Sequence, residues 1–523
     1  MRLISIAAGV SVAVLALTGC TGGESPGGAD SSTFTMGLSA DPGNLDPQAS
    51  AASGLLQATL LAYDSLLSID SSGTISSQLA TDWSLDGATV NLTLGENITC
   101  SDGAPFTAED AAANLAWVGN PENQSPMLGV FLPAGAVATA VSETELTIEL
   151  GAPSPFVLNG LAMLPMVCGN AIDDRSVLAA ETHGTGPFVL TEAAQGDQYV
   201  YELRDDYEWG PGGLSSATDG LPEKVVIRVV SNETTAANLL LSGELNAAAI
   251  IGSDSGRLDA AGLFRSETPV IAGQMWFNHS ADRLMGDKTL RLALTHSLDL
   301  EQIEKVTTSD KGEPGTTFAV SDPVACVGDS VSGALPEFDV DAAAALLDDA
   351  GWKAGADGVR TKNGEPLTVT FIQDASMGAG GAAAAELAVQ AWTALGVQVT
   401  SRVQEETVMI ETVFGTGDWD VAWLPLNISS PDQLVPFASG PAPADGGSNF
   451  AQVDNADYIA GVEGAANLPG ADGCDEWLDA ESTLVRDANI IPFANQLGLT
   501  YGSGAEFTTN GQIVPLSIRM ASE

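Results

Sequence analysis

The stretch from Gln274 to Asp299 constrains the fold most, because it reads as the place where one lobe ends and another begins. Met275-Trp276-Phe277 is an apolar run typical of a buried strand, and the polar Asn278 and His279 follow it. Asp287 then predicts the start of a helix with an apolar stripe on a 3.6-residue period. A strand that ends in polar residues beside a new helix borders either a binding cleft or an ordinary core, and these residues alone favour the ordinary core.

The chain is too long for a single hydrophobic core. One core stops growing near roughly 250 to 300 residues, so 523 residues predict two or three domains. The 68 acidic and 18 basic residues give a net charge of -50. We therefore expect no nucleic-acid partner, because phosphates require clustered Lys and Arg. Attraction to anionic lipids by charge is equally excluded. The acidic residues are scattered, as on a solvated surface, and identify no cationic ligand.

The N-terminus carries an export signal. Residues 1–19 place Arg2 before an apolar run, and the Leu17-Thr18-Gly19-Cys20 sequence resembles the lipobox of bacterial lipoproteins. A transmembrane anchor is the alternative, but it needs about 20 apolar residues and the run is shorter. We expect cleavage before Cys20, acylation of its thiol, and a flexible tether over residues 20–32. The exported protein would then be held by lipid to the outer face of the cell membrane.

The four cysteines after the lipobox predict two disulfides, since an even number outside the cytoplasm is typical of a disulfide framework. Four cysteines allow three pairings. We favour Cys100–Cys168 and Cys326–Cys474, because each pair would lie on one side of the proposed lobe boundary. The cysteines and histidines show no metal-ligand spacing, so neither a metal nor a cofactor is expected.

Short motifs follow one another along the chain in a characteristic order. They are LDP, YDSLLSID..G, LATDW, SDGAPFTAEDAAANL, GTGPFVL, RDDYEWG, LLLSGELNAA, DKTLRLALTHSLDLEQI and DVDAAAALLDDAGWKAGADGVRTKNGEPLTV. In that order the motifs resemble those of the extracellular solute-binding proteins that deliver peptides, nickel complexes or sugars to ABC importers. They extend from Leu45 to Pro492 and cover nearly the whole chain after the tether.

The resemblance implies an α/β fold of the two-lobed, periplasmic-binding-protein-like kind (class II, cluster C type), with an inserted subdomain in the first lobe. The expected divisions are residues 33–70, 184–272 and 488–523 for the first lobe, 71–183 for the subdomain and 273–487 for the second lobe. The implied function is capture of a small solute, such as a peptide, between the lobes and its delivery to the permease subunits of an ABC importer. We expect a monomer.

The resemblance also places the ligand contacts. After the LDP motif, the first lobe is expected to contribute Ala51, Ala52 and Ser53. The opening stretch is expected to contribute Trp276, Asn278 and His279, for each of which a structural role is equally open. The block WDVAWLPLNISSPDQLVP is expected to contribute Trp423, Leu424, Leu426, Asn427 and Ser429.

Peptide-binding members of the family carry an Asp in this last block, which holds the free α-amino group of the ligand. Counting back from Pro431 puts Asn427 at that position, and counting forward from Asp420 puts Ser429 there. Either alignment lacks the carboxylate and so weakens the case for a free-amino peptide. A shifted alignment with Asp432 in that place is the remaining alternative.

No motif of a known catalytic site stands out in the chain. H-E-x-x-H and P-loop motifs are absent from the sequence, and the G-x-S-x-G match at residues 23–27 lies in the tether and forms no nucleophile elbow. Residues 378–383 fit the loose G-x-G-x-x-G/A dinucleotide pattern, but a strand-helix-strand unit explains them better in an exported protein. We expect no enzyme. The alternatives are a sensory or scaffold lipoprotein with the same fold and an extracellular hydrolase that uses paired carboxylates.

Overall fold

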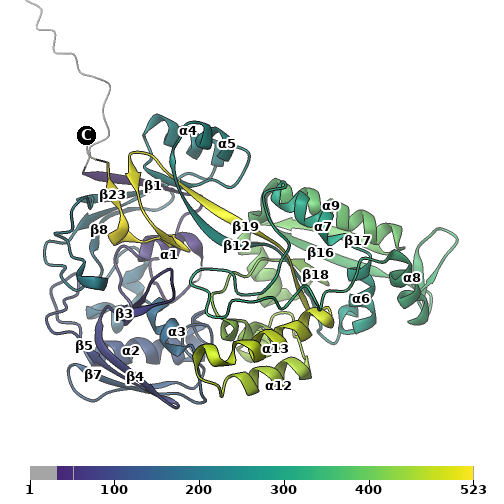
Figure 1. Ribbon diagram of the computed structural model, residues 1–523, viewed down its shortest axis with the longest axis horizontal. Coiled ribbons are helices and arrows are strands. Elements are labelled where there is room, and N and C mark those ends of the chain that lie inside the picture. The colour runs from purple at the N-terminus through teal and green to yellow at the C-terminus, as the bar shows by residue number, and fades with distance from the viewer. Residues whose placement is uncertain (1–31, 51, 522–523) are drawn as a thin grey trace, which may run out of the picture.

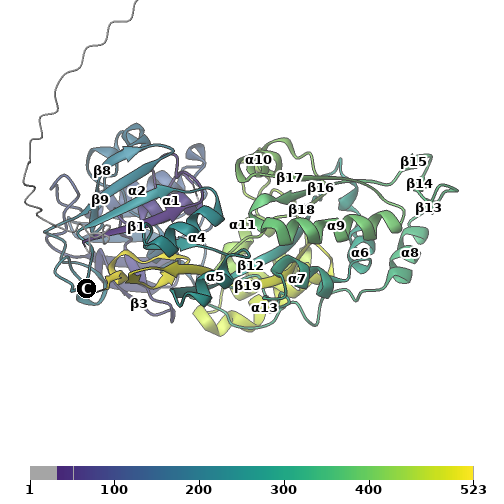
Figure 2. The same cartoon turned by 90° about the horizontal axis from the view of Figure 1, so that it is seen from above.

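The computed structural model describes residues 32–50 and 52–521, and these form two lobes joined by a pair of long strands (Figure 1). Figure 2 shows the same two bodies from above, with the joining strands between them. No helix within the described part of the chain is long and apolar enough to cross a membrane. The predicted export signal, Cys20 and Ala51 lie outside the described residues.

One sheet of ten strands runs through both lobes, in the order β17-β16-β18-β12-β19-β11-β1-β10-β9-β8. The first lobe holds the strands β1 (Thr33–Leu38), β8 (Phe188–Ala194), β9 (Gln198–Leu203), β10 (Lys224–Val229) and β11 (Ala247–Ala249). Its helices are α1 (Ser53–Thr59), α4 (Glu233–Ser242) and α5 (Ser255–Ala260). On β10, Val225 and Ile227 are fully buried while their neighbours are partly exposed, which is the period of two expected of a strand with one face on the core.

The inserted subdomain has a separate four-stranded antiparallel sheet and its own apolar core. Its elements are β4 (Ala80–Asp86), β5 (Thr89–Leu94), β6 (Val137–Ala140), β7 (Glu145–Glu149), α2 (Ala108–Gly119) and α3 (Val157–Met163). The 3-10 helix η3 (Arg175–Ala179) comes later in the chain and packs in the first-lobe core through Leu178. The short hairpin of β2 (Leu67–Ile69) and β3 (Ile75–Ser77) leads into the subdomain. Thr107 and Asp110 start α2 with a reciprocal capping box, as the sequence predicts.

The chain returns to the first lobe through the predicted glycine turn before β8. Gly186 donates its backbone N–H to the carbonyl oxygen of Ala62 at 2.9 Å. A Cβ atom at Gly186 would lie only 2.4 Å from the carbonyl carbon of Ala62. Glycine is therefore required at this position because two backbones approach closely there.

The second lobe packs helices on the parallel strands β16 (Thr368–Asp374), β17 (Gln398–Gln404) and β18 (Val421–Trp423). Its other elements are α6 (Lys288–His296), α7 (Leu300–Thr308), α8 (Val340–Asp349), β13 (Lys353–Ala354), β14 (Arg360–Lys362), β15 (Glu365–Pro366), α9 (Gly378–Ala394), α10 (Glu406–Ile410), α11 (Val435–Ala438), α12 (Ala456–Ala465) and α13 (Cys474–Arg486). Asp287 accepts a hydrogen bond from the Thr289 N–H and caps α6 as predicted. The dinucleotide-like residues 378–383 form the first turns of α9.

The lobes are joined by β12 (Phe264–Phe277) and β19 (Ile490–Gly502), which pair antiparallel over almost their full length. At one end β19 pairs with β11 of the first lobe, and at the other β12 pairs with β18 of the second. Residues 490–494 pack in the second lobe, because Ile491 and Phe493 belong to its core. The return crossing thus lies a few residues later than the predicted boundary at 487.

Short strands close the C-terminal part of the first lobe: β20 (Ala505–Glu506), β21 (Thr509–Asn510), β22 (Gln512–Ile513) and β23 (Arg519–Met520).

One predicted helix is shorter than expected. The pattern predicts a helix from Leu55 to Leu67, but α1 ends at Thr59. Beyond it Tyr63 is buried beside the Gly184 turn. The packing of Tyr63 against that turn therefore ends the helix earlier than the apolar pattern alone predicts.

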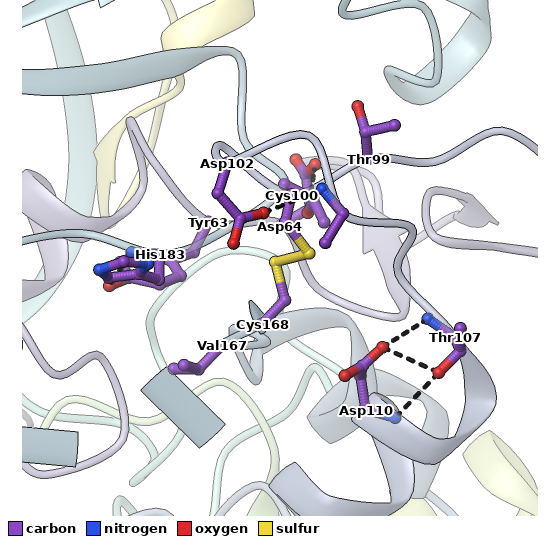
Figure 3. The surroundings of a disulfide bond; sticks show 12 residues. Tyr63, Asp64, Thr99, Cys100, Asp102, Thr107, Asp110, Val167, Cys168 and His183 are labelled. Carbon is purple, nitrogen blue, oxygen red and sulfur yellow. Dashed lines mark hydrogen bonds between the residues drawn. A yellow bond between two sulfur atoms is a disulfide. The ribbon is translucent and has the colours of Figure 1, made fainter. Parts of the chain in front are cut away.

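Both predicted disulfides are confirmed. Cys100 and Cys168 join two segments of the inserted subdomain with their Cα atoms 6.0 Å apart (Figure 3). Cys326 and Cys474 join two segments of the second lobe with a Cα–Cα distance of 5.2 Å. Both distances fall in the range that a disulfide spans. Neither bond links the lobes to each other.

Candidate ligand-binding site

The direction of the strands shows which end of the second lobe faces the first. β12 comes from the first lobe at Phe264 and reaches the second lobe with Met275 to Phe277. β18 runs antiparallel to it, with Val421 opposite Phe277 and Trp423 opposite Met275. The carboxyl ends of β18 and its parallel neighbour β16 therefore point toward the first lobe. In open α/β sheets, ligands bind outside the carboxyl ends of the strands.

A loop over residues 424–430 follows β18 at this end, and hydrogen bonds hold it to β12. Gln274 contributes two of them: its backbone oxygen accepts from Leu424 N at 3.1 Å, and its Oε1 accepts from Leu426 N at 2.8 Å. The indole of Trp276 donates to the Leu424 carbonyl oxygen at 2.8 Å. The 424–430 loop is thus fixed to the strand that joins the lobes, while Leu424 and Leu426 stay partly exposed.

Asn427 is the exposed residue of this loop, and its amide has a defined orientation. Its Oδ1 accepts a hydrogen bond of 2.7 Å from the backbone N–H of Ile271 on β12. Because a backbone N–H can only donate, the oxygen must be the atom that faces Ile271. The Nδ2 group, which only donates, is then the part of the amide left for another molecule.

The end of the loop meets the inserted subdomain. The Ser429 hydroxyl lies 3.9 Å from the Met163 sulfur at the end of α3, and the Phe156 ring lies 6.2 Å from the Trp477 ring of α13. Ser429 is buried, and the Gln433 side chain accepts a 2.9 Å hydrogen bond from its backbone N–H. The loop, α13 and α3 form a contact between the second lobe and the subdomain.

Asp432 is the carboxylate nearest to this contact in sequence. Burial raises the pKa of Asp432 to about 6, although the Ser430 hydroxyl donates a hydrogen bond to it. Its side chain therefore carries a full negative charge only above that pH. Three residues are alternatives for the Asp that holds the ligand in peptide-binding members. Asp432 is the one with a carboxylate, and Asn427 is the one with an exposed side chain.

On the first lobe, the predicted contacts lie where α1 begins. Ala52 precedes the helix in an extended conformation, and Ser53 is its first residue and is exposed. Ala52 donates its N–H to the Ser50 hydroxyl at 3.2 Å. As at the beginning of any helix, the first backbone N–H groups of α1 have no partner within the helix.

The two tryptophans predicted as ligand contacts are core residues. Trp276 and Trp423 have no exposed surface. Trp276 packs 4.7 Å from Phe450, while Trp423 lies 5.2 Å from Phe371 and 4.7 Å from Phe493, measured between ring centroids. The expectation of direct solute contact is wrong for both side chains in this conformation. Trp276 supports the 424–430 loop through its hydrogen bond to Leu424 and through the apolar cluster on which Leu424 and Leu426 pack.

Asn278 and His279 lie at the end of β12 that points away from the first lobe. The Asn278 N–H donates to the Asp420 carbonyl oxygen at 3.0 Å, and its Nδ2 donates to the Trp419 oxygen at 2.9 Å. Burial lowers the pKa of His279 to about 3, so the ring is neutral. Asn278 braces the amino end of β18, whereas the His279 N–H donates to the Ala451 carbonyl oxygen at 2.8 Å, so neither residue lies at the end of the second lobe that faces the first.

Sequence reasoning missed two residues that the structure brings to this region. Gln274 holds the 424–430 loop, and Met163 reaches it from the inserted subdomain. A Gln directly before an apolar run signals a polar group that holds a neighbouring segment, whereas a single Met gives no signal. The pocket of about 320 Å³ beside His183 and Glu192 lies elsewhere, and none of the predicted contacts lines it.

A sequence profile described as "Bacterial extracellular solute-binding proteins, family 5 Middle" matches residues 74–445. Protein XP55 of Streptomyces lividans is 26% identical over 391 residues, covering 71% of this chain and 67% of the relative. The nickel-binding periplasmic protein of Escherichia coli K12 is 28% identical over 334 residues, or 59% of each chain. The matched region is thus only about three fifths of that relative's length.

The fold is shared with solved structures over nearly the full length. A substrate-binding protein from Microbacterium hydrocarbonoxydans, complexed with 4-hydroxybenzoate hydrazide, superposes with a TM-score of 0.79. Its sequence is 23% identical, and the match covers 94% of this chain and 100% of that one. The predicted two-lobed α/β fold is confirmed. The chain belongs to family 5 of the bacterial extracellular solute-binding proteins.

Proposed function

We propose that this protein captures a small solute between its two lobes and delivers it to an ABC importer. The observation that carries the proposal is the pair β12 and β19, which joins two separately packed lobes through one antiparallel ribbon. A two-stranded ribbon bends more easily than a packed interface, so the lobes can close on a ligand that contacts both. A closed form stabilised by the solute is then available for recognition by the permease subunits.

The proposal includes a lipid anchor at Cys20 and an extracellular location. Acyl chains on Cys20 would keep the receptor beside the importer, and residues 20–32 would act as the tether. We infer that the protein binds without catalysis. An intact mass of the exported protein with an unmodified Cys20 would contradict the anchor.

The proposed solute contacts are Asn427, Leu424 and Leu426 of the second lobe and the 51–53 segment of the first, with Ser429 and Asp432 at the margin. Asn427 supports a specific ligand polarity. Its Oδ1 is engaged by Ile271, so the amide presents N–H donors. An N–H donor at this position can bind a carbonyl or carboxylate oxygen of the solute. It cannot bind an ammonium group, which is itself a donor and requires an acceptor. The solute therefore places an acceptor at Asn427 and needs no free α-amino group.

The substitution Asn427→Asp tests this polarity. The carboxylate keeps an acceptor for Ile271 and replaces the Nδ2 donors with a second charged acceptor. With a tripeptide in free-amino and N-acetylated forms, we expect the wild type to prefer the acetylated form. The variant should shift the ratio of the two dissociation constants at least about tenfold toward the free amine, since a hydrogen bond to a charged group contributes about 1.5 to 3 kcal/mol. Isothermal titration calorimetry measures both constants.

Asn97→Asp is the matched control, because it adds the same charge at an exposed turn residue of the inserted subdomain. It should leave the ratio unchanged. A wild type that prefers the free-amino peptide, or an Asn427→Asp variant with an unaltered ratio, would contradict the assigned polarity.

A further inference from the structure

The segment at the start of α1 is preceded by a stretch, residues 44–48, that is tied down on several sides. Leu45 donates its N–H to the Leu178 oxygen at 2.7 Å. Asp46 accepts from the Gln48 N–H at 3.0 Å, and the Gln48 carbonyl oxygen accepts from the Ser125 hydroxyl at 2.6 Å. Asp46 and Gln48 are both buried. The contacts that hold residues 44–48 therefore also fix the chain as it leads into residues 49 and 50.

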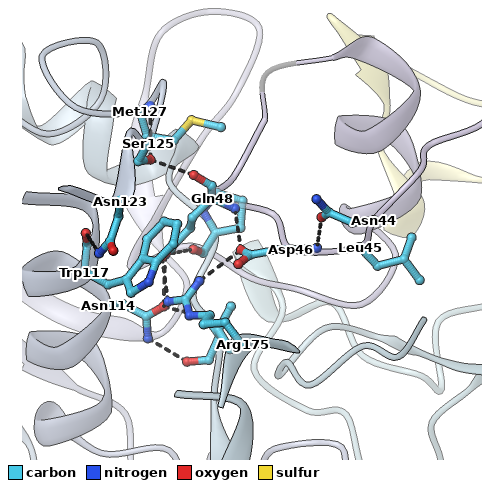
Figure 4. A network of polar contacts seen from close by, with 12 residues as sticks. Asn44, Leu45, Asp46, Gln48, Asn114, Trp117, Asn123, Ser125, Met127 and Arg175 are labelled. Atoms are coloured by element: carbon cyan, nitrogen blue, oxygen red, sulfur yellow. Dashed lines mark hydrogen bonds and ion pairs between the residues drawn. The ribbon is translucent and has the colours of Figure 1, made fainter. Parts of the chain in front are cut away.

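Arg175 of η3 is the charged centre of this arrangement (Figure 4). Its Nη1 donates to Asp46 Oδ1 at 2.9 Å, and its Nη2 donates to Gln48 Oε1 at 2.9 Å. The Asp46–Arg175 ion pair is largely shielded from water, with side chains 8% and 13% exposed. Two parallel contacts from one planar group fix the direction of the 44–48 stretch as well as its distance.

The same guanidinium also contacts the inserted subdomain. Its Cζ lies 4.3 Å from the centre of the Trp117 ring of α2, and Nη2 is 3.4 Å from Asn114 Oδ1. Asn114 is fully buried and accepts from Gln48 Nε2 at 2.9 Å and from the Val167 N–H at 2.9 Å. Val167 is next to the disulfide at Cys168. Arg175 thus joins the 44–48 stretch of the first lobe to the rigid part of the subdomain.

Lysine cannot reproduce these contacts. A guanidinium offers a planar fork of donors and a flat face for Trp117, whereas an ammonium is a point charge without that face. The hydrogen bonds, the ion pair and the ring contact of the Arg175 side chain in the described structure go to Asp46, Gln48, Asn114 and Trp117, and none goes to the 424–430 loop or to residues 52 and 53. Its effect on a solute would be exerted through the backbone that it holds.

We propose that Arg175 is a positioning residue, which holds Ala52 and Ser53 at the solute through residues 44–48 and transmits movement of the inserted subdomain to them. The proposal rests on the proposed function, because the 51–53 segment is there assigned to the solute. The subdomain meets the 424–430 loop through Met163, so one body contacts both sides of the site. When the second lobe closes onto α3, the subdomain moves. Asn114 and Arg175 then pass this movement to residues 44–48 and so to the solute contact at Ala52 and Ser53.

The test is Arg175→Lys in the full chain, purified after export. Hydrogen-deuterium exchange without any solute should show amides 52–56 exchanging at least about tenfold faster than in the wild type. Affinity for N-acetylated tripeptides and for 4-hydroxybenzoate hydrazide, measured by calorimetry, should fall at least about tenfold for whichever probe binds. Exchange in β16 of the second lobe should not change.

Arg204→Lys is the matched control. Arg204 also stacks on a tryptophan, 5.2 Å from the Trp209 ring centre, and pairs with Asp206, but it holds Thr99 and not the 44–48 stretch. It should leave exchange of amides 52–56 and affinity unchanged. Unaltered exchange in Arg175→Lys, or equal effects of both variants, overturns the positioning role. A wild type that binds neither probe speaks against the proposed function for these solutes, and the exchange result still decides the role of Arg175.

Discussion

Replacing Cys326 and Cys474 by Ser should destabilise the second lobe by about 5 kcal/mol in the chain-entropy model, the largest effect that we expect from the chain. The bond spans 148 residues, so its loss frees a long loop in the unfolded state. In the folded state it fastens residues 309–339, which link α7 to α8 without a helix or strand, to the first turn of α13. Calorimetric melting should show the second-lobe transition moved to lower temperature.

The double variant of Cys100 and Cys168 is its control, because that bond lies in the inserted subdomain and spans only 68 residues. It should lower the stability of the subdomain and leave the second-lobe transition in place. An unshifted second-lobe transition in the Cys326 and Cys474 variant would show that the bond adds nothing to the linking segment.

Glu481→Gln should make the second lobe more stable at pH 8 and change little at pH 4. Glu481 on α13 is 1% exposed. Its Oε2 accepts from the Ser330 hydroxyl at 2.7 Å, and its Oε1 has no hydrogen-bond partner among the described residues. Burial raises the pKa of this carboxyl to about 7 from its ordinary 4.5. Glutamine keeps an acceptor for Ser330 and removes the buried charge.

The pH window follows from the raised pKa. Between pH 4.5 and 7 the folded protein keeps the Glu481 proton that the unfolded chain has lost, so stability falls as the pH rises through this window. Above pH 7 the loss is complete and amounts to about 3 kcal/mol by the usual conversion of a pKa difference. The variant should therefore have a flatter stability profile, measured by urea unfolding at a series of pH values.

Glu476→Gln on the same helix is the control, because Glu476 is exposed. It should change stability by less than about 0.5 kcal/mol at every pH. A Glu481→Gln variant with the same slope as the wild type between pH 4.5 and 7 would contradict the burial of the charge. Because Ser330 lies in the segment that the Cys326 bond fastens, the two sets of substitutions should not be additive.

Local chemistry in the sequence was sufficient to predict several helix starts and turns, although not the end of α1. Thr107 with Asp110 and Asp287 are sequence signals for helix starts, and Asn363-Gly364 is a signal for a hairpin turn; the structure has the capping box, the cap and the turn between β14 and β15 at these residues. Each depends on neighbours within a few residues, so the sequence alone specifies it. The disulfides were predictable for a different reason, because only a pairing within each lobe leaves the lobes free.

The site was predicted less well, because exposure depends on contacts between distant segments. Asn278 follows the last residue of β12, and the direction of that strand decides that Asn278 lies at the end far from the first lobe. Trp423 is buried by Phe371 and Phe493, which come from other strands. The orientation of the Asn427 amide depends on Ile271, more than a hundred residues earlier. Sequence spacing contains none of this information.

The most direct measurement is native mass spectrometry of the exported protein, purified from its own host without added ligand. Capture of a solute between the lobes predicts a 1:1 complex whose extra mass is lost on unfolding. The Asn427 amide further predicts that the released solute has a carbonyl or carboxylate oxygen and needs no free α-amino group. A crystal structure with a bound peptide whose free amine is paired with Asp432 would contradict this account of the site.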